Sequence, residues 1–123
     1  MKRVLWISRH QMTQDQKYDL EQVLGDQVVL VMWTETVESM ATLLPLVEQA
    51  DAVAAVLPTN LLAQMWKHCR GKPLLQSVSR RVPTGRVHVF PDGTVEPEFR
   101  FVHGGWQQIC RLELEVLQLS KPP

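Results

Sequence analysis

Cysteine is scarce in this sequence, and long apolar runs are missing from it. Its 123 residues include two cysteines, Cys69 and Cys110, which are far apart and lie among apolar neighbours. This placement predicts two buried free thiols, not a disulfide or a metal-binding pair. No apolar run reaches the length of about 18 residues that a membrane span requires. We therefore expect no membrane contact.

The first residues also lack the pattern of an exported protein. Lys2 and Arg3 provide a basic start, but Arg9 and His10 interrupt the apolar stretch that follows them. A signal peptide requires a longer apolar segment, of about 7–15 residues. We therefore expect a protein that is not exported and resides in the cytoplasm.

Several motifs that identify common enzyme classes are absent. The sequence contains no GxGxxG, no GxxxxGK[ST], no GxSxG and no Cys-x-x-Cys. Their absence argues against a dinucleotide fingerprint, a P-loop NTPase, a nucleophile elbow and a thiol metal site. The histidines show no metal-ligand spacing, and we expect neither a metal nor another cofactor; they are His10, His68, His88 and His103.

Acidic residues are missing from one long stretch of the chain. Residues 52–91 contain none, whereas residues 15–51 contain eight acids and one cation, Lys17. This segregation suggests an anionic ligand on one side of the fold, although acidic helices and basic loops can equally neutralise each other. The net charge is zero. A small anion is therefore a better ligand than duplex DNA, which we do not expect to bind.

What the sequence does contain is a repeated strand–helix rhythm. The length and a hydrophobic content of 45% fit one globular domain, 1–123. Thr13 and Gln16 form a capping box, Gly25 is a C-cap, and Pro45 predicts a kink or a restart in its helix. Strands are expected at 4–7, 27–33, 52–57 and 73–78, and helices at 14–24, 38–49 and 61–70. This βαβαβαβ order predicts an α/β fold with a Rossmann-like, three-layer parallel sheet.

The last third, residues 82–123, reads as an antiparallel β extension of the 1–81 core. Strands at 86–90 and 94–103 flank a turn at 91–93, and Pro97 indicates an edge strand. Gly104–Gly105 is expected to turn the chain, with His103 a turn residue or a site residue. Apolar residues alternate with charged ones at 110–116, which favours a strand. Glu and Leu favour a helix, so the structure of 107–119 stays open. An uncovered edge here would suit a dimer contact.

Polar residues follow each predicted parallel strand. Because the carboxyl ends of parallel strands meet at one edge of a sheet, four polar loops are expected to lie together there. Their arginines suit phosphate groups, and Asn60 and Ser79 suit ribose or base edges. The loops are Ser8–Gln11, Thr34–Thr36, Pro58–Asn60 and Ser79–Arg81. They predict an anion-binding crevice, or else loops that are simply solvated.

Two of these loops carry a resemblance. The first strand runs into Ser-Arg-His-Gln-Met-Thr at 8–13, and the third ends in Leu-Pro-Thr-Asn at 57–60. In architecture and loop character, residues 1–81 resemble the small CRISPR-associated proteins of the Csx type. Those proteins are Rossmann-like ring nucleases and binders of cyclic oligoadenylate second messengers. The antiparallel end has no counterpart in that family.

The resemblance implies a homodimer with a ring-shaped nucleotide between two loop edges. Cleavage would need no metal, because a ribose 2′-hydroxyl would attack its neighbouring phosphate and leave a cyclic phosphate. Ser8 and Arg9 would hold the phosphate, and His10 would act as acid or base. The ligand-binding residues would be Gln11, Thr34, Thr36, Thr59, Asn60, Ser79, Arg80 and Arg81. The alternative is a non-catalytic nucleotide-sensing or protein-interaction module of a mobile element or defence system.

Overall fold

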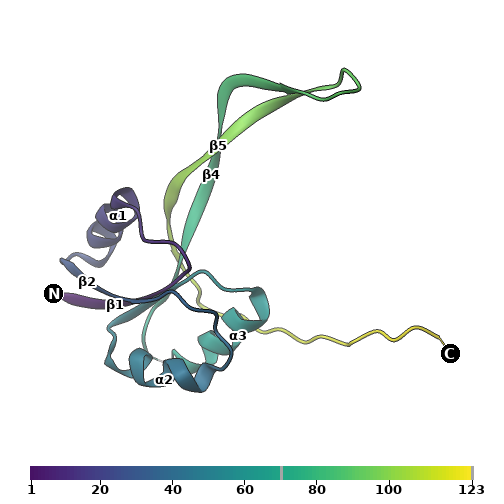
Figure 1. Cartoon of the computed structure of the whole chain (residues 1–123). Helices are drawn as coiled ribbons and strands as arrows, with labels where there is room; N and C mark the ends of the chain where they lie inside the picture. The colour runs from purple at the N-terminus through teal and green to yellow at the C-terminus, as the bar shows by residue number, and fades with distance from the viewer. Residues whose placement is uncertain (70, 123) are drawn as a thin grey trace.

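The computed structural model describes residues 1–69 and 71–122. Figure 1 shows three helices around one end of a sheet whose last two strands extend far beyond them. The elements in chain order are β1 (Lys2–Ile7), α1 (Gln14–Leu24), β2 (Val28–Trp33), α2 (Met40–Gln49), β3 (Ala52–Ala55), α3 (Thr59–His68), β4 (Leu74–Val89) and β5 (Val95–Gln108). None of the helices in this part of the chain is long and apolar enough to span a membrane.

The five strands form one sheet in the order β2-β1-β3-β4-β5. The first four are parallel, and β5 is antiparallel to β4. Val4 of β1 lies between Leu30 of β2 and Ala52 of β3. This arrangement confirms the predicted α/β fold with a parallel sheet and an antiparallel extension.

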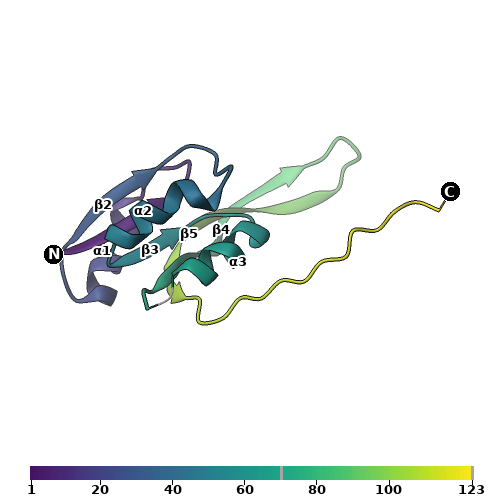
Figure 2. The same ribbon diagram turned by 90° about the horizontal axis from the view of Figure 1, so that it is seen from below.

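The sheet has helices on both faces. Leu5, Ile7 and Val53 point to one face and pack with residues of α2 and α3. Val4 and Trp6 point to the other face and pack with Leu20 of α1. Figure 2 shows the same division, with α2 and α3 together on one side of the strands. The expected three layers are therefore present, and their two small cores share the central strands.

The helix ends follow the local sequence signals. Thr13 and Gln16 form the capping box of α1, and Gly25 closes the helix with φ 71°. Ser39 caps α2 through its side chain, and α2 continues through Pro45 as one helix. Residue 70, the last residue of the third predicted helix, lies outside the described residues.

The strand predicted at 27–33 is less buried than expected. It forms β2, the edge strand, in which Val28 is buried but Val29 and Met32 are exposed. The apolar run of residues 27–33 does not reveal the edge position. A run of this composition also fits a central strand that is buried on both faces. The sheet therefore has an apolar open edge.

The loop predicted at Ser79–Arg81 does not exist. Residues 74–89 form one 16-residue strand, β4, which includes the segments predicted as two separate strands. Its partner β5 supplies the hydrogen bonds that keep the backbone extended through Ser79, Arg80 and Arg81. The two strands leave the domain together as a twisted ribbon (Figure 1), which we call the arm and define as residues 79–103.

Gly104–Gly105 does not turn the chain either. Ser77 pairs with Trp106 and Ser79 pairs with His103, so two residues of β5 lie opposite one residue of β4. This is a β-bulge, which adds one residue to a strand. Gly105 has φ 120°, and a Cβ on Gly104 would lie 3.2 Å from the Arg80 Cβ. The glycines are needed for the bulge, not for a turn.

Residues 109–122, the described part of the chain after β5, have no regular secondary structure. The Ile109 N–H donates to the Leu74 carbonyl, and Ile109 and Leu112 pack against the α2–α3 core. Beyond them the chain runs extended away from the domain (Figure 2). The strand favoured at 110–116 is thus wrong, because no neighbouring strand pairs with these residues. Cys110 is exposed, contrary to expectation, whereas Cys69 is buried as predicted.

A candidate anion-binding crevice at the carboxyl edge

Three of the predicted polar loops meet at the carboxyl edge of the sheet. Between them lies a cavity of about 140 Å³ that Ser8, Arg9, Glu35, Thr36 and Pro58 help to line. These residues follow β1, β2 and β3 and so come together from positions far apart in the chain. Parallel strand order explains this, because neighbouring strands release their loops at the same edge.

The arginine of this cavity is held in place by its neighbour loop. The Arg9 Nη2–H group donates a hydrogen bond to the Thr36 hydroxyl, and the Nη2–Oγ1 distance is 3.0 Å. This contact joins the loop after β1 to the loop after β2. The remaining guanidinium donors are free to face an anion, since one hydrogen bond uses only one of five.

Ser8 stabilises the shape of the first loop. Its side chain is buried, and its hydroxyl accepts a hydrogen bond from the His10 N–H at 3.1 Å. The His10 carbonyl in turn accepts from the Trp6 indole N–H at 2.8 Å. The His10 side chain is exposed and does not line the cavity. The backbone of this loop is therefore fixed, while Arg9 and His10 project from it.

A second cavity continues from the first. It has a volume of about 320 Å³ and shares Glu35, Thr36 and Val37 with its neighbour. Trp33 lines it, and the buried Trp33 Nε1 has no hydrogen-bond partner among the described residues. A buried donor without a partner is uncommon in proteins.

Helix α3 begins beside the first cavity. Pro58 is its N-cap and provides no side-chain hydrogen bond, so the amides of the first turn have no cap. Pro58 and Leu61 also line the cavity. Uncapped amides at a helix N-terminus attract anions through their N–H groups and the helix dipole. Together with Arg9, they make this cavity suitable for a negatively charged group.

The other residues predicted for the site lie around the crevice or away from it. Gln11, Thr34, Thr59 and Asn60 are exposed on the same edge but do not line either cavity. Ser79, Arg80 and Arg81 lie on the arm, and Arg81 stacks its guanidinium 4.1 Å from the centre of the Phe99 ring. The crevice is thus built from three loops instead of four.

A polar cluster on the α1 face was not anticipated from the sequence. His103 Nε2 lies 2.8 Å from an Asp19 carboxylate oxygen, and His103 Nδ1 lies 3.1 Å from the Ser77 hydroxyl. The Gln16 amide also donates to Ser77. Asp19 and Gln16 lie one turn apart on α1, and they contact His103 and Ser77 of the two arm strands. The cluster therefore joins α1 to the start of the arm.

The bulge is what brings this cluster together. If both glycines paired regularly with β4, His103 would lie opposite Arg80 and would point to the opposite face from Ser77, because side chains alternate along a strand. With the bulge, His103 pairs with Ser79 and shares the face of Ser77 and Trp106. The pair of glycines in the sequence was the only available signal, and it also fits a turn.

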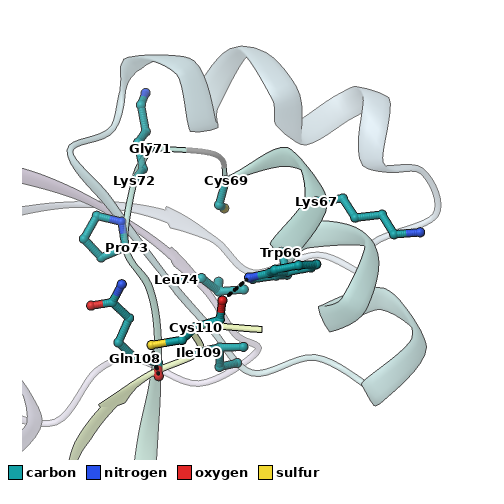
Figure 3. A pocket seen from close by; sticks show the side chains of 10 residues that line it. All are labelled: Trp66, Lys67, Cys69, Gly71, Lys72, Pro73, Leu74, Gln108, Ile109 and Cys110. Carbon is teal, nitrogen blue, oxygen red and sulfur yellow. Dashed lines mark hydrogen bonds between the residues drawn. The ribbon is translucent and has the colours of Figure 1, made fainter. Parts of the chain in front are cut away.

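A larger cavity lies at the other end of the sheet. Figure 3 shows its lining, which includes Trp66, Cys69, Lys72 and Cys110, and its volume is about 490 Å³. Lys72 already donates to the Val47 and Glu48 carbonyls at the end of α2. Trp66 donates to the Cys110 carbonyl over 3.1 Å. Because Lys72 and Trp66 are engaged within the protein, this cavity is a weaker candidate for an anion than the crevice.

Comparison with known proteins adds no assignment. No family model, curated protein or solved structure matches this chain.

Proposed function

We propose that this protein binds a phosphate-bearing nucleotide in the crevice at the carboxyl edge. The observation that carries the proposal is that Arg9 and Glu35 line the same cavity, next to the uncapped end of α3. A guanidinium and helix amides bind phosphate, whereas a carboxylate accepts hydrogen bonds from ribose hydroxyls. The two charges match the two ends of a nucleoside phosphate.

The adjoining cavity supports a ligand larger than phosphate. It extends the crevice past Glu35 to Trp33, whose aromatic ring helps to line it and suits a base or a sugar. Among nucleotides, we favour a cyclic oligoadenylate, as the resemblance of residues 1–81 implies. Such a ring would extend beyond one crevice and would use a second copy of the chain. Its cleavage would involve His10, which projects from the same loop as Arg9.

Thermal denaturation with a panel of ligands tests the proposal. Cyclic tri-, tetra- and hexa-adenylate, adenosine monophosphate and inorganic phosphate are each added without metal. A ligand at about a hundred times its dissociation constant stabilises a protein by about 2.7 kcal/mol. We expect this stabilisation with at least one nucleotide and its loss in Arg9→Ala. No shift with any of them would refute nucleotide binding.

A matched variant separates the two charges of the crevice. Glu35→Gln keeps the hydrogen-bonding shape and removes the negative charge, so it should bind inorganic phosphate more tightly than the wild type does. The same variant should lose affinity for a nucleotide whose ribose uses the carboxylate. Product analysis of mixtures with wild type and His10→Ala then distinguishes cleavage from binding alone.

A further inference from the structure

The arm has one apolar face and one polar face. Directly opposed residues of an antiparallel pair share a face, and alternate residues along a strand do so as well. One face of the arm carries valine, proline and phenylalanine side chains: Pro83, Val87, Val89, Val95, Pro97, Phe99 and Phe101. The other face carries the polar side chains Arg80, His88, Glu96 and Arg100, with Val82 and Val102 beside them near the base. The arm is thus amphipathic, like a strand pair that covers a core.

No core lies under the apolar face. Val87, Val89 and Val95 are each more than half exposed, and Phe101 is 73% exposed. The helices lie at the other end of the sheet (Figures 1 and 2), and α1 contacts the start of the ribbon through Asp19 and His103. A two-stranded ribbon with an uncovered apolar face has little stability in water. This face therefore requires a partner.

Charges on the arm indicate which partner fits. Among the paired residues of the arm, Arg81 is the one carboxylate or cation side chain on the apolar face, and it lies at the base of the arm. Asp92 lies at the tip, in the turn between the strands, where its carboxylate accepts hydrogen bonds from the Thr94 N–H and hydroxyl. These bonds lower the pKa of Asp92, which keeps it ionised. One arm thus carries a cation at its base and an anion at its tip.

We propose that the apolar face of the arm binds the same face of a second copy, with the two arms packed tip to base. A twofold axis makes every contact occur twice. In this orientation each Asp92 approaches the Arg81 of the other copy, whereas a tip-to-tip packing would oppose like charges. The occupant is thus a second arm, and the apolar side chains of both are removed from water. This interface does not depend on the ligand proposed above.

Neighbouring residues on opposite faces provide the first test. Val89→Glu places a charge in the proposed interface, and His88→Glu places the same charge one residue away on the polar face. Light scattering after size-exclusion chromatography should give a dimer mass for the wild type and His88→Glu, and a monomer mass for Val89→Glu. A monomeric wild type, or a dimer that survives Val89→Glu, would overturn the proposal. A nucleotide-induced shift that persists in monomeric Val89→Glu would show that the two proposals are separate.

Exchanging the charges tests the tip-to-base orientation. Arg81→Asp alone and Asp92→Arg alone each oppose like charges, so each should weaken dimerisation by about tenfold or more. The double variant carries an anion at the base and a cation at the tip, so it should recover most of the wild-type affinity. Circular dichroism of each variant verifies that the hairpin still forms. A double variant as weak as the sum of the single changes would reject this orientation, and the dimer would then pack differently.

Discussion

The two cysteines show how strongly the surroundings of a residue decide its chemistry. Cys69 is buried at the end of α3, and burial raises its pKa from 9.0 to about 11. The thiolate is the reactive form of cysteine, and at this pKa the Cys69 thiol stays protonated at neutral pH. Burial also keeps reagents from reaching it, so both effects lower its reactivity. Cys110 lies on the exposed segment that follows β5.

We therefore expect selective alkylation of the native protein. Iodoacetamide at pH 8 should modify Cys110 quickly and Cys69 only after denaturation, as peptide mass spectrometry would show. Cys110→Ser then serves as the control and should resist modification in the folded state. Rapid labelling of Cys69 in the native protein would mean that the cavity of Figure 3 opens in solution.

At the scale of elements, the parallel half was predictable because its signals are local. Thr13 and Gln16 fix the start of α1, and Gly25 fixes its end within the sequence itself. Short apolar runs outside the helices identify β1 and β3 as buried strands. The loops that follow these strands meet because parallel strands end at the same edge of the sheet. This is why the sequence alone could place Ser8 and Arg9 at the crevice.

The arm could not be predicted in the same way. Ser79, Arg80 and Arg81 are polar, and residues of this kind commonly form loops. They are extended here only because β5, which comes later in the chain, pairs with them. The Asp19–His103–Ser77 cluster likewise depends on residues up to 84 positions apart and on a one-residue bulge. Apolar and charged residues alternate at 110–116 as in a strand, but these residues pair with no neighbouring strand and form none.

The bulge gives a prediction for one of its glycines. Gly105 has a positive φ that side-chain-bearing residues rarely adopt, so Gly105→Ala should destabilise the protein by about 1–3 kcal/mol. Urea denaturation measures this change. Gln108→Ala, on the exposed end of the same strand, is the control and should change stability far less. Equal effects of the two substitutions would mean that the bulge tolerates a Cβ.

At the scale of the whole molecule, the core and the proposed dimer interface lie in different parts of the chain. The buried hydrophobic residues of the described chain all lie between Val4 and Leu75, within the body that the helices cover. The arm adds no residue to this core. If the arm dimerises as proposed, the stability of the body and the affinity of the arm for a second copy are separable properties.

Shortening the arm tests this separation. Replacing residues 81–101 with a short Gly-containing turn leaves Ser77, His103 and Trp106 in place. We expect a protein that unfolds cooperatively, retains the ligand-induced shift and is monomeric by light scattering. A shortened chain that fails to fold would show that the arm contributes to the stability of the body.

The bulge at Gly104–Gly105 also has a consequence for how this chain tolerates changes in length. Loss of one of the two glycine codons would restore a regular register between β4 and β5. Trp106 would still pair with Ser77 and His103 with Ser79, so Phe99 and Phe101 would keep the face that they share with Arg81. The chain can therefore lose three nucleotides of coding sequence at this point without reversing the arm. A one-residue deletion between Pro97 and Val102 would instead move the residues on one side of it to the other face.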